Sequence, residues 1–155
     1  MKVRLAASAA LALAIVVGGT GCAMVTYQAT TEKYDASDGV SADVGALKLR
    51  NVLLVMEEGG DEASLVFTVS NTGDDDLELE LGLADGDTQT VDVDAHSQLV
   101  FGGDGDDEEP LVIEDIDAGP GELATLYFSV SGAEGVEVGT PILDGRLPEY
   151  SDLVP

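Results

Sequence analysis

The sequence contains few of the residues from which most catalytic and metal sites are built. Its 155 residues include no Trp, one Cys, one His and three Met. A single Cys cannot close a disulfide within the chain, and so few soft or imidazole groups leave little for a metal site or a nucleophilic triad. Basic residues are scarce as well, with 6 Lys and Arg against 31 Asp and Glu, for a formal net charge of −25. Because a chain this acidic repels nucleic acid, the composition excludes nucleic-acid binding.

The amino-terminal segment has the three parts of a secretory signal peptide. The basic residues Lys2 and Arg4 precede an apolar run over 5–17, and small residues follow at 18–21. As a helix this run would rise roughly 20 Å, whereas the hydrocarbon core of a bilayer is about 30 Å thick. We therefore predict a cleaved signal peptide over 1–21 rather than a permanent transmembrane helix.

The end of this segment resembles the lipobox of bacterial lipoproteins, a motif that ends in a small residue followed by cysteine. Here it reads Gly19-Thr20-Gly21-Cys22, with Gly19 where such boxes usually carry Leu. Cys22 is the only thiol and can take a diacylglycerol through a thioether, and two or more acyl chains hold a protein stably on a bilayer. The resemblance implies that Cys22 is the lipidation site and that the mature protein is anchored at the extracellular face of the cell membrane without spanning it.

Residues 23–43 are rich in Thr, Ser, Ala and Asp and show no apolar periodicity. Such a composition is typical of a segment with no fold of its own. We therefore predict that residues 22–43 form the lipidated cysteine and a flexible tether. A coil of about 20 residues would place the domain a root-mean-square distance of roughly 25 Å from the lipid.

From residue 44 to residue 143, apolar residues recur at every second position, which is typical of half-buried strands. The clearest run, 77–83, alternates Leu with Glu or Gly. The other predicted strands are 47–56, 65–70, 90–94, 98–101, 111–114, 126–130 and 135–143. Turn formers rich in Gly and Asp separate these runs, and no helical pattern competes with them. About eight short strands predict one all-β domain, an antiparallel Greek-key β-sandwich over 44–143.

The alternation slips inside the first of these runs. Leu47 and Leu49 face one way, Asn51 falls on their side, and Leu53 and Val55 resume the pattern. This interruption predicts a β-bulge near Asn51.

Two features mark the end of the domain. Pro141 lacks an N–H, so we expect it near the end of the last strand or at a sheet edge. Residues 144–155 contain Pro148 and Pro155 and are predicted to form a C-terminal tail.

Negative charge is concentrated in the predicted domain. No base occurs between Arg50 and Arg146, yet residues 51–145 contain 25 acids. Since like charges on neighbouring strands repel and salt screens them, we predict that stability rises with ionic strength. The charge fits either a solvated coat suited to solubility or a salty habitat, or a patch for a cationic partner such as an envelope protein.

The densest acidic cluster invites a calcium hypothesis, since hard cations are bound by carboxylate oxygens in flexible turns. In an EF-hand loop that began at Asp104, Gly would be needed where Glu109 stands, and Glu where Asp115 stands. We therefore predict only weak, nonspecific divalent binding and no dedicated metal site. The candidate residues are Asp104, Asp106, Asp107, Glu108 and Glu109.

No complete catalytic constellation is present in the sequence. His96 is the only histidine, its neighbour Ser97 lies in no Gly-x-Ser-x-Gly elbow, and no Walker loop or dinucleotide fingerprint follows a strand. Carboxylates are abundant, but abundance without a pocket does not indicate glycosidase chemistry. We expect that the protein is not an enzyme and uses no cofactor.

From Gly45 to Leu143 the order of motifs resembles the small actinobacterial LpqE-type envelope lipoproteins and, more distantly, the extracytoplasmic copper chaperones of the PCuAC type. The motifs are Lys48-Leu49-Arg50-Asn51-Val52, Val69-Ser70-Asn71-Thr72-Gly73, Gly119-Pro120-Gly121 and Gly135-Val136-Glu137-Val138. The resemblance implies an immunoglobulin- or cupredoxin-like sandwich in a lipoprotein of the cell envelope.

The copper ligands of those chaperones are missing. The family binds Cu(I) through two His and two Met, as suits a soft metal, whereas only Met24, Met56 and His96 remain here beyond the lipobox. Residues 123–125, after the Pro-Gly turn, lack the family's His-x-Met pair. We therefore expect a non-catalytic binding or accessory module of a Gram-positive envelope, with metal handling through carboxylates as the alternative.

Overall fold

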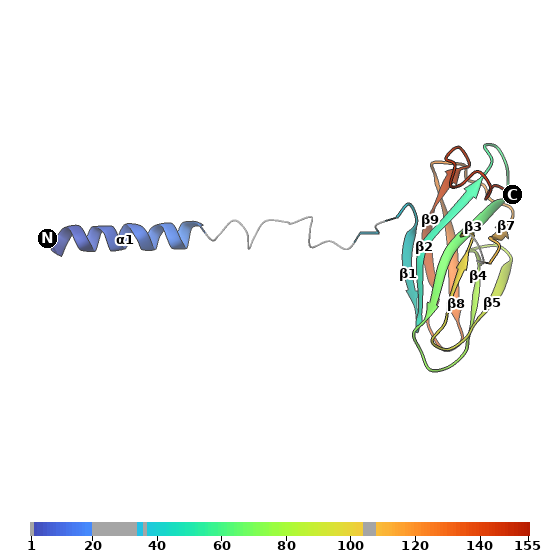
Figure 1. Cartoon of the computed structure of the whole chain (residues 1–155), viewed down its shortest axis with the longest axis horizontal. Coiled ribbons are helices and arrows are strands. Elements are labelled where there is room, and N and C mark those ends of the chain that lie inside the picture. Colours follow the sequence, from blue (N-terminus) through green and yellow to red (C-terminus); the bar gives the residue numbers. More distant parts are fainter. Residues whose placement is uncertain (1, 20–33, 36, 104–107) are drawn as a thin grey trace. The chain divides into compact units, whose positions relative to one another are not determined.

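The computed structural model describes residues 2–19, 34–35, 37–103 and 108–155 (Figure 1). The chain divides into two units, Met1–Tyr34 and Asp35–Pro155. In the first unit the apolar run lies in a single helix, α1 (Lys2–Gly19). Among the described residues, no helix combines the length and the apolar character needed to cross a membrane.

The second unit is built from nine strands, which confirms the prediction of an all-β domain. Each of the eight predicted runs forms a strand, β2 to β9. The strands are β1 (Val40–Val44), β2 (Leu47–Met56), β3 (Ala63–Asn71), β4 (Leu77–Leu83), β5 (Thr88–Val93), β6 (Gln98–Phe101), β7 (Leu111–Ile113), β8 (Leu123–Val130) and β9 (Val136–Asp144). β1 overlaps the end of the predicted tether and pairs with β2. Residues 40–43 of the predicted tether therefore belong to this strand, and the β structure begins at least as early as Val40.

The strands form one path, β5-β4-β8-β9-β2-β3-β6, with β1 added to β2 and β7 to β3. This mixed sheet curls into a nearly closed barrel (Figure 1). All strand pairs are antiparallel except β2 and β9, which run parallel. The prediction of an exclusively antiparallel Greek-key sandwich is therefore wrong, since the last strand lies beside the second one in the same direction.

β9 passes from one partner to another along its length. Its residues from Val136 to Pro141 pair with β8, and its residues from Ile142 to Asp144 pair with β2. Pro141 pairs with Leu123 of β8 and lies three residues before the end of β9, so the prediction of a position near the end of the last strand is confirmed, although β9 is not an edge strand. The missing N–H falls where β9 changes partners, and the adjacent Ile142 N–H donates to the carbonyl of Glu122 at 3.1 Å.

The core lies inside the barrel and is made by alternate side chains of each strand. Leu79 and Leu81 of β4 are fully buried, which confirms the aliphatic face of that strand. Phe67 of β3 and Phe101 of β6 stack with ring centroids 4.7 Å apart. These aromatic and branched residues suit a pleated surface that is buried on one side.

The predicted bulge is present and reverses the faces of β2. The pairing with β3 shifts register between Arg50 and Leu53, and Asn51 adopts a φ of 52°. Asn tolerates this left-handed region better than most residues. Beyond the bulge Val52, Leu54 and Met56 face the core with Leu47 and Leu49. Leu53 and Val55 face outward, so the prediction that they resume the side of Leu47 is wrong.

Residues 145–155 cover this outward apolar surface. Leu53, Val55 and Val66 are buried under a cluster that also includes Leu143, Tyr150, Leu153 and Val154. The Tyr150 hydroxyl donates to Asp38 Oδ2 at 2.6 Å. The predicted C-terminal tail is therefore a packed strap that closes the outer side of β2 and β3.

Candidate binding cleft

Four of the candidate residues named from the sequence lie outside the described residues. They are Cys22, Asp104, Asp106 and Asp107. Lipidation and the first half of the acidic cluster therefore stay predictions.

Glu108 and Glu109 belong to the described part of that cluster, and both are exposed. Main-chain bonds hold Glu108, whose N–H donates to Val100 O and whose carbonyl accepts from Gly102 N, each at 2.9 Å. Both side chains line a hollow of about 400 Å³ beside residues 152–155 of the strap. Within the described ranges, no group of three or more His, Cys, Asp or Glu is arranged to hold a metal ion.

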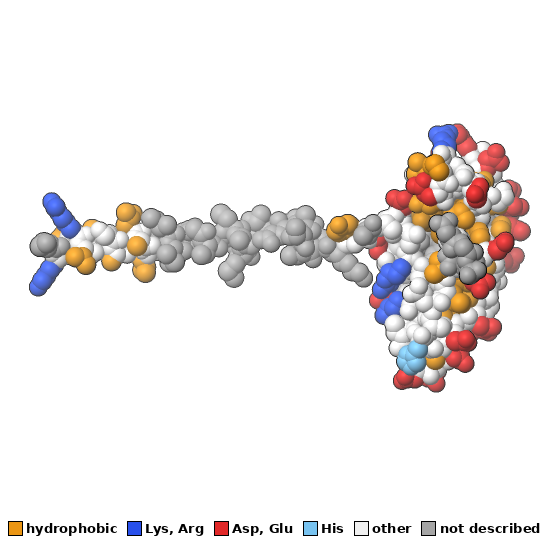
Figure 2. Space-filling view, in the orientation of Figure 1, with side chains coloured by type: hydrophobic (Ala, Val, Ile, Leu, Met, Phe, Trp, Pro, Cys, Tyr) orange, Lys and Arg blue, Asp and Glu red, His pale blue; other side chains and the backbone are white. Residues whose placement is uncertain are grey.

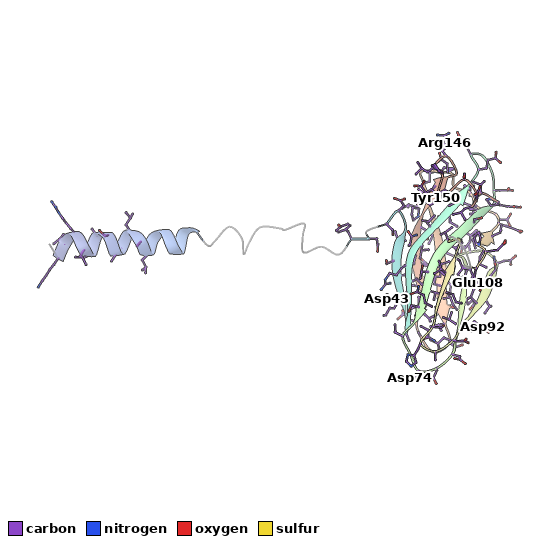
Figure 3. All side chains as sticks on the ribbon, viewed as in Figure 1. Asp43, Asp74, Asp92, Glu108, Arg146 and Tyr150 are labelled. Carbon is purple, nitrogen blue, oxygen red and sulfur yellow. The ribbon has the colours of Figure 1, made fainter. Side chains whose placement is uncertain are left out.

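The structure does not bring His96 and Met56 together. His96 is 66% exposed and its Nε2 lies 3.0 Å from Asp74 Oδ1. Met56 is fully buried at the far end of β2, beside Ala63, whereas the loop that carries His96 lies next to Asn71 at the other end of β3. Figure 3 labels Asp74 at the end of the domain opposite to Tyr150. These two residues therefore form no soft-metal site.

A larger cleft opens where the β4–β5 turn meets the segment after β7. It has a volume of about 480 Å³ and is lined by residues 83–86, 115–118 and 124–125. We call it the acidic cleft, because Asp85, Asp115 and Asp117 lie on its walls. Its apolar lining includes Leu83 and Ile116. A pocket with apolar walls and a few charged groups is the usual form of a binding site.

Gly82 and the turn that follows it position the first wall. A β-carbon on Gly82 would overlap the carbonyl oxygen of Asp87, so only glycine allows the two ends of this hairpin to approach so closely. The Gly86 N–H donates to Leu83 O at 3.1 Å, and the Ala84 N–H donates to Thr125 O of β8 at 3.2 Å. Asp85 is therefore carried on a turn that is fixed at both ends.

The second wall is the segment that follows β7. Asp115 adopts a φ of 59°, a conformation that few non-glycine residues adopt. The next residue, Ile116, is buried in the core, and its N–H donates to Asp61 O at 3.0 Å. Anchoring Ile116 in this way leaves Asp115 and Asp117 on either side of it, exposed to solvent.

A narrower hollow continues from the acidic cleft along the gap between β5 and β7. It has a volume of about 220 Å³ and shares Gly86 and Asp115 with the cleft. Asp87 and Glu114 add two more carboxylates, and the Gln89 Nε2 donates to Val112 O at 2.6 Å across the gap. We call this gap the seam.

No basic side chain lines the cleft or the seam. The three bases of the β domain pair elsewhere: Lys48 and Arg50 with Asp43, and Arg146 with Glu58 and Asp144. Hydrogen bonds from Arg50 and Lys48 lower the pKa of the Asp43 carboxyl. In Figure 2 red side chains follow one margin of the domain, and blue ones form two small patches. The carboxylates of the cleft therefore have no internal counter-charge.

Solved structures of PCuAC domains share this fold at low sequence identity. The copper-bound PCuAC domain from PmoF2 superposes with a TM-score of 0.51 at 16% identity and covers 68% of this chain and 98% of its own. The apo PmoF2 PCuAC domain gives 0.52 at 15%, with 70% and 98% covered. The apo PCuAC domain from PmoF1 gives 0.50 at 17%, with 66% and 98% covered. No family model and no curated protein matches the sequence.

These comparisons define the class of fold: the β domain is a distant structural relative of PCuAC domains. They confirm the more distant of the two resemblances noted in the sequence, and at the level of fold alone. At residues 123–125, where that resemblance places a His-x-Met pair, the chain begins β8, and Ala124 and Thr125 line the acidic cleft.

Sequence reasoning missed the acidic cleft. The acids at 85–87 were part of a predicted turn, and Asp115 and Asp117 were not among the candidate residues of this acid-rich chain. One local feature sets these acids apart. The acids at 85 and 87 flank Gly86, which lies in a turn, and those at 115 and 117 flank Ile116, which is buried in the core. That the two segments face each other depends on how β4 and β8 pair, which no local pattern encodes.

Proposed function

We propose that this chain is an exported, lipid-anchored, non-catalytic binding module that holds a cationic partner in its acidic cleft. The observation that supports the proposal is a cleft of about 480 Å³ with three carboxylates on apolar walls and no basic side chain in its lining. An opposite charge brought to such a site gains from the field of the whole domain. The partner we infer is a cationic protein of the same envelope, of the Gram-positive type that the resemblance to LpqE-type lipoproteins implies.

The lipid anchor is the part of the proposal that the sequence supports. The signal-like segment 1–21 ends at Cys22, the only thiol of the chain. Mass spectrometry of the native protein should find a mature chain that begins at Cys22 and carries a diacylglycerol. An unmodified thiol, or an intact leader, would contradict the anchor and the extracellular location with it.

Binding in the cleft is tested by titrating a lysine-rich peptide into the β domain and its variants in a calorimeter. The double variant Asp115→Asn/Asp117→Asn should bind about tenfold more weakly, since two exposed ion pairs contribute up to about 1 kcal/mol each and a tenfold change corresponds to about 1.4 kcal/mol. The matched control Glu78→Gln/Asp92→Asn removes the same charge from the outer surface of β4 and β5, so it should bind nearly as well as the wild type. Equal losses in both would mean that net charge alone, and no particular site, governs binding.

The alternative function is metal handling through carboxylates. The likeness of fold to a domain whose structure holds copper favours it, whereas the described carboxylates form no group arranged for a metal. Calorimetric titration with calcium and with Cu(I) separates the two proposals. Tight, stoichiometric uptake of either ion would favour the alternative, and weak binding that salt abolishes would favour the cationic partner.

A further inference from the structure

The seam is the place where the barrel stays open. β5 and β6 are the two ends of the strand path, and β7 continues the β6 side by pairing with another part of β3. Among the described residues, no main-chain pairing joins β5 to β6 or to β7. Each side of the seam is therefore the edge of a sheet, and an edge strand presents main-chain N–H and C=O groups to any further strand.

One side chain bridges this gap. The Gln89 Nε2 of β5 donates to the Val112 carbonyl of β7 at 2.6 Å. Paired strands lie about 4.8 Å apart and bond directly through their main chains. In the described part of the chain Gln89 and Val112 are joined through this side chain and not through their main chains, so the main-chain groups of β5 and β7 stay unpaired with each other.

The same contact shows which way Val112 faces. Its carbonyl points into the seam, and in an extended strand the N–H of a residue points to the same side as its carbonyl. The Val112 side chain is 39% exposed, whereas Ile113 next to it is buried in the core. β7 therefore offers both a donor and an acceptor to a strand that enters the seam.

Charge selects what can enter. Asp87, Glu114 and Asp115 line the seam, and the acidic cleft continues it with Asp85 and Asp117. An added strand projects alternate side chains to opposite faces, so every second residue of it would meet the carboxylates. A segment with Lys or Arg at alternate positions complements this lining, and an acidic segment is repelled.

We propose that an extended cationic segment of a partner protein adds to the domain as a strand between β5 and β7, and displaces the Gln89 bridge. The proposal rests on the proposed function, because it specifies how the cationic partner is held at the same cleft. Main-chain bonds supply the affinity in such strand addition, and side-chain positions supply the specificity.

The test uses the β domain and a fluorescent peptide of alternating Lys and Val, with binding followed by anisotropy. Val112→Pro removes the N–H that faces the seam but keeps the side that pairs with β3, and proline is tolerated on edge strands. We expect this variant to bind about tenfold more weakly, the ratio that corresponds to about 1.4 kcal/mol. Gln89→Ala should bind more tightly than the wild type, since the peptide no longer competes with the bridge.

A second peptide keeps the proposal testable if Val112→Pro fails to fold. It has the same sequence and charge, but alternate main-chain amides are N-methylated. The wild-type domain should bind it at least about tenfold more weakly, because N-methylation removes the donors of an added strand. Amide hydrogen exchange in β5 should slow when the unmodified peptide is bound.

The outcomes separate this proposal from the proposed function. If the N-methylated peptide binds as well as the unmodified one while Asp115→Asn/Asp117→Asn still weakens binding, strand addition is overturned and the cationic cleft stands. If Gln89→Ala binds more weakly than the wild type, the bridge is not what the peptide displaces, and the proposal is also overturned. If no cationic peptide binds, the proposed function fails and strand addition fails with it.

Discussion

The outer surfaces of the two halves of the barrel are covered in opposite ways. On β2 and β3, residues 145–155 bury Leu53, Val55 and Val66, and we call this surface the strapped face. On β4 and β5, charged side chains stand in solvent, and Glu78 lies directly opposite Asp92 in the strand pairing. We call that surface the acidic face.

The difference shows how one chain combines stability with a high negative charge. All the bases of the β domain belong to the half with the strapped face: Lys48 and Arg50 on β2, and Arg146 in the strap, at the end of the domain where Figure 3 also labels Tyr150. That half gains apolar burial and the ion pairs that its three bases form. The acidic face has neither, so its carboxylates stay solvated and repel one another. Its contribution is a negative electrostatic potential and not apolar packing.

Removal of the strap should have the largest effect. A chain that ends at Leu147 loses Tyr150, Leu153 and Val154 and exposes the apolar side chains beneath them, so its free energy of unfolding should fall by about 3 to 5 kcal/mol. Urea unfolding measures the change. Arg146→Gln is the control, because an exposed ion pair contributes only about 0–1 kcal/mol. A shortened chain as stable as the full one would show that the strap merely rests on the surface.

Salt should stabilise the domain through its unbalanced acids. Each pair of like charges on neighbouring strands costs a few tenths of a kcal/mol. Salt screens this repulsion, because the Debye length falls from about 30 Å at 0.01 M to about 3 Å at 1 M. We expect the melting temperature to rise steadily between 10 mM and 1 M sodium chloride. A flat profile over that range would mean that the acidic face is too well solvated for its charges to interact.

A single charge reversal should sharpen the comparison further. Glu78→Lys replaces a repulsive cross-strand pair with an attractive one, and should raise the free energy of unfolding by about 0.5 to 1 kcal/mol. Glu137→Lys is matched in charge change, but its cross-strand partner is Tyr127, so it should stabilise less. If both variants gain equally, the relief comes from net charge rather than from the pair. Thermal unfolding at low salt measures both.

The smallest effect concerns the hydrogen bond of the strap. The bond to Asp38 raises the pKa of Tyr150 to about 12, so the protonated hydroxyl is favoured in the folded chain. Its contribution is therefore complete below pH 10, the pKa of an ordinary tyrosine, and is lost as the pH rises through about 12. Wild type should be slightly more stable than Tyr150→Phe at pH 8 and should lose that advantage in alkali. A stability difference between the two proteins that stays constant from pH 8 into alkali would show that this bond does not stabilise the strap.

Strand positions could be predicted because the signal is local. In β4 each Leu faces the core and each Glu faces water, so the residue pattern states the structure directly. β1 escaped prediction because its five residues include Ser41 and Asp43, and the strand forms by pairing with β2. The parallel neighbours β2 and β9 are far apart in the sequence, and alternation carries no information about partners or direction.

The bulge shows where such reasoning fails even when it locates a feature. Asn51 was identified correctly, but one inserted residue exchanges the two faces of every position that follows. Leu53 and Val55 are apolar because the strap covers them, so both faces of this part of β2 carry hydrophobic residues. Only the packed position of residues 145–155 shows which of these two apolar faces lies under the strap and which faces the core. The cleft was hidden for the same reason, since its walls meet through tertiary pairing.

The change of partners within β9 ties the two halves of the barrel into one cooperative unit. Its first part completes the ladder of β8, and its last three residues complete that of β2, so neither half has its full set of neighbours without it. Because synthesis begins at the amino terminus, β9, which joins the two halves, is the last strand to be made. Folding has to wait for almost the whole polypeptide, and this long-range closure makes the process slow. A nascent chain cannot close the barrel until the residues up to Asp144 have been made.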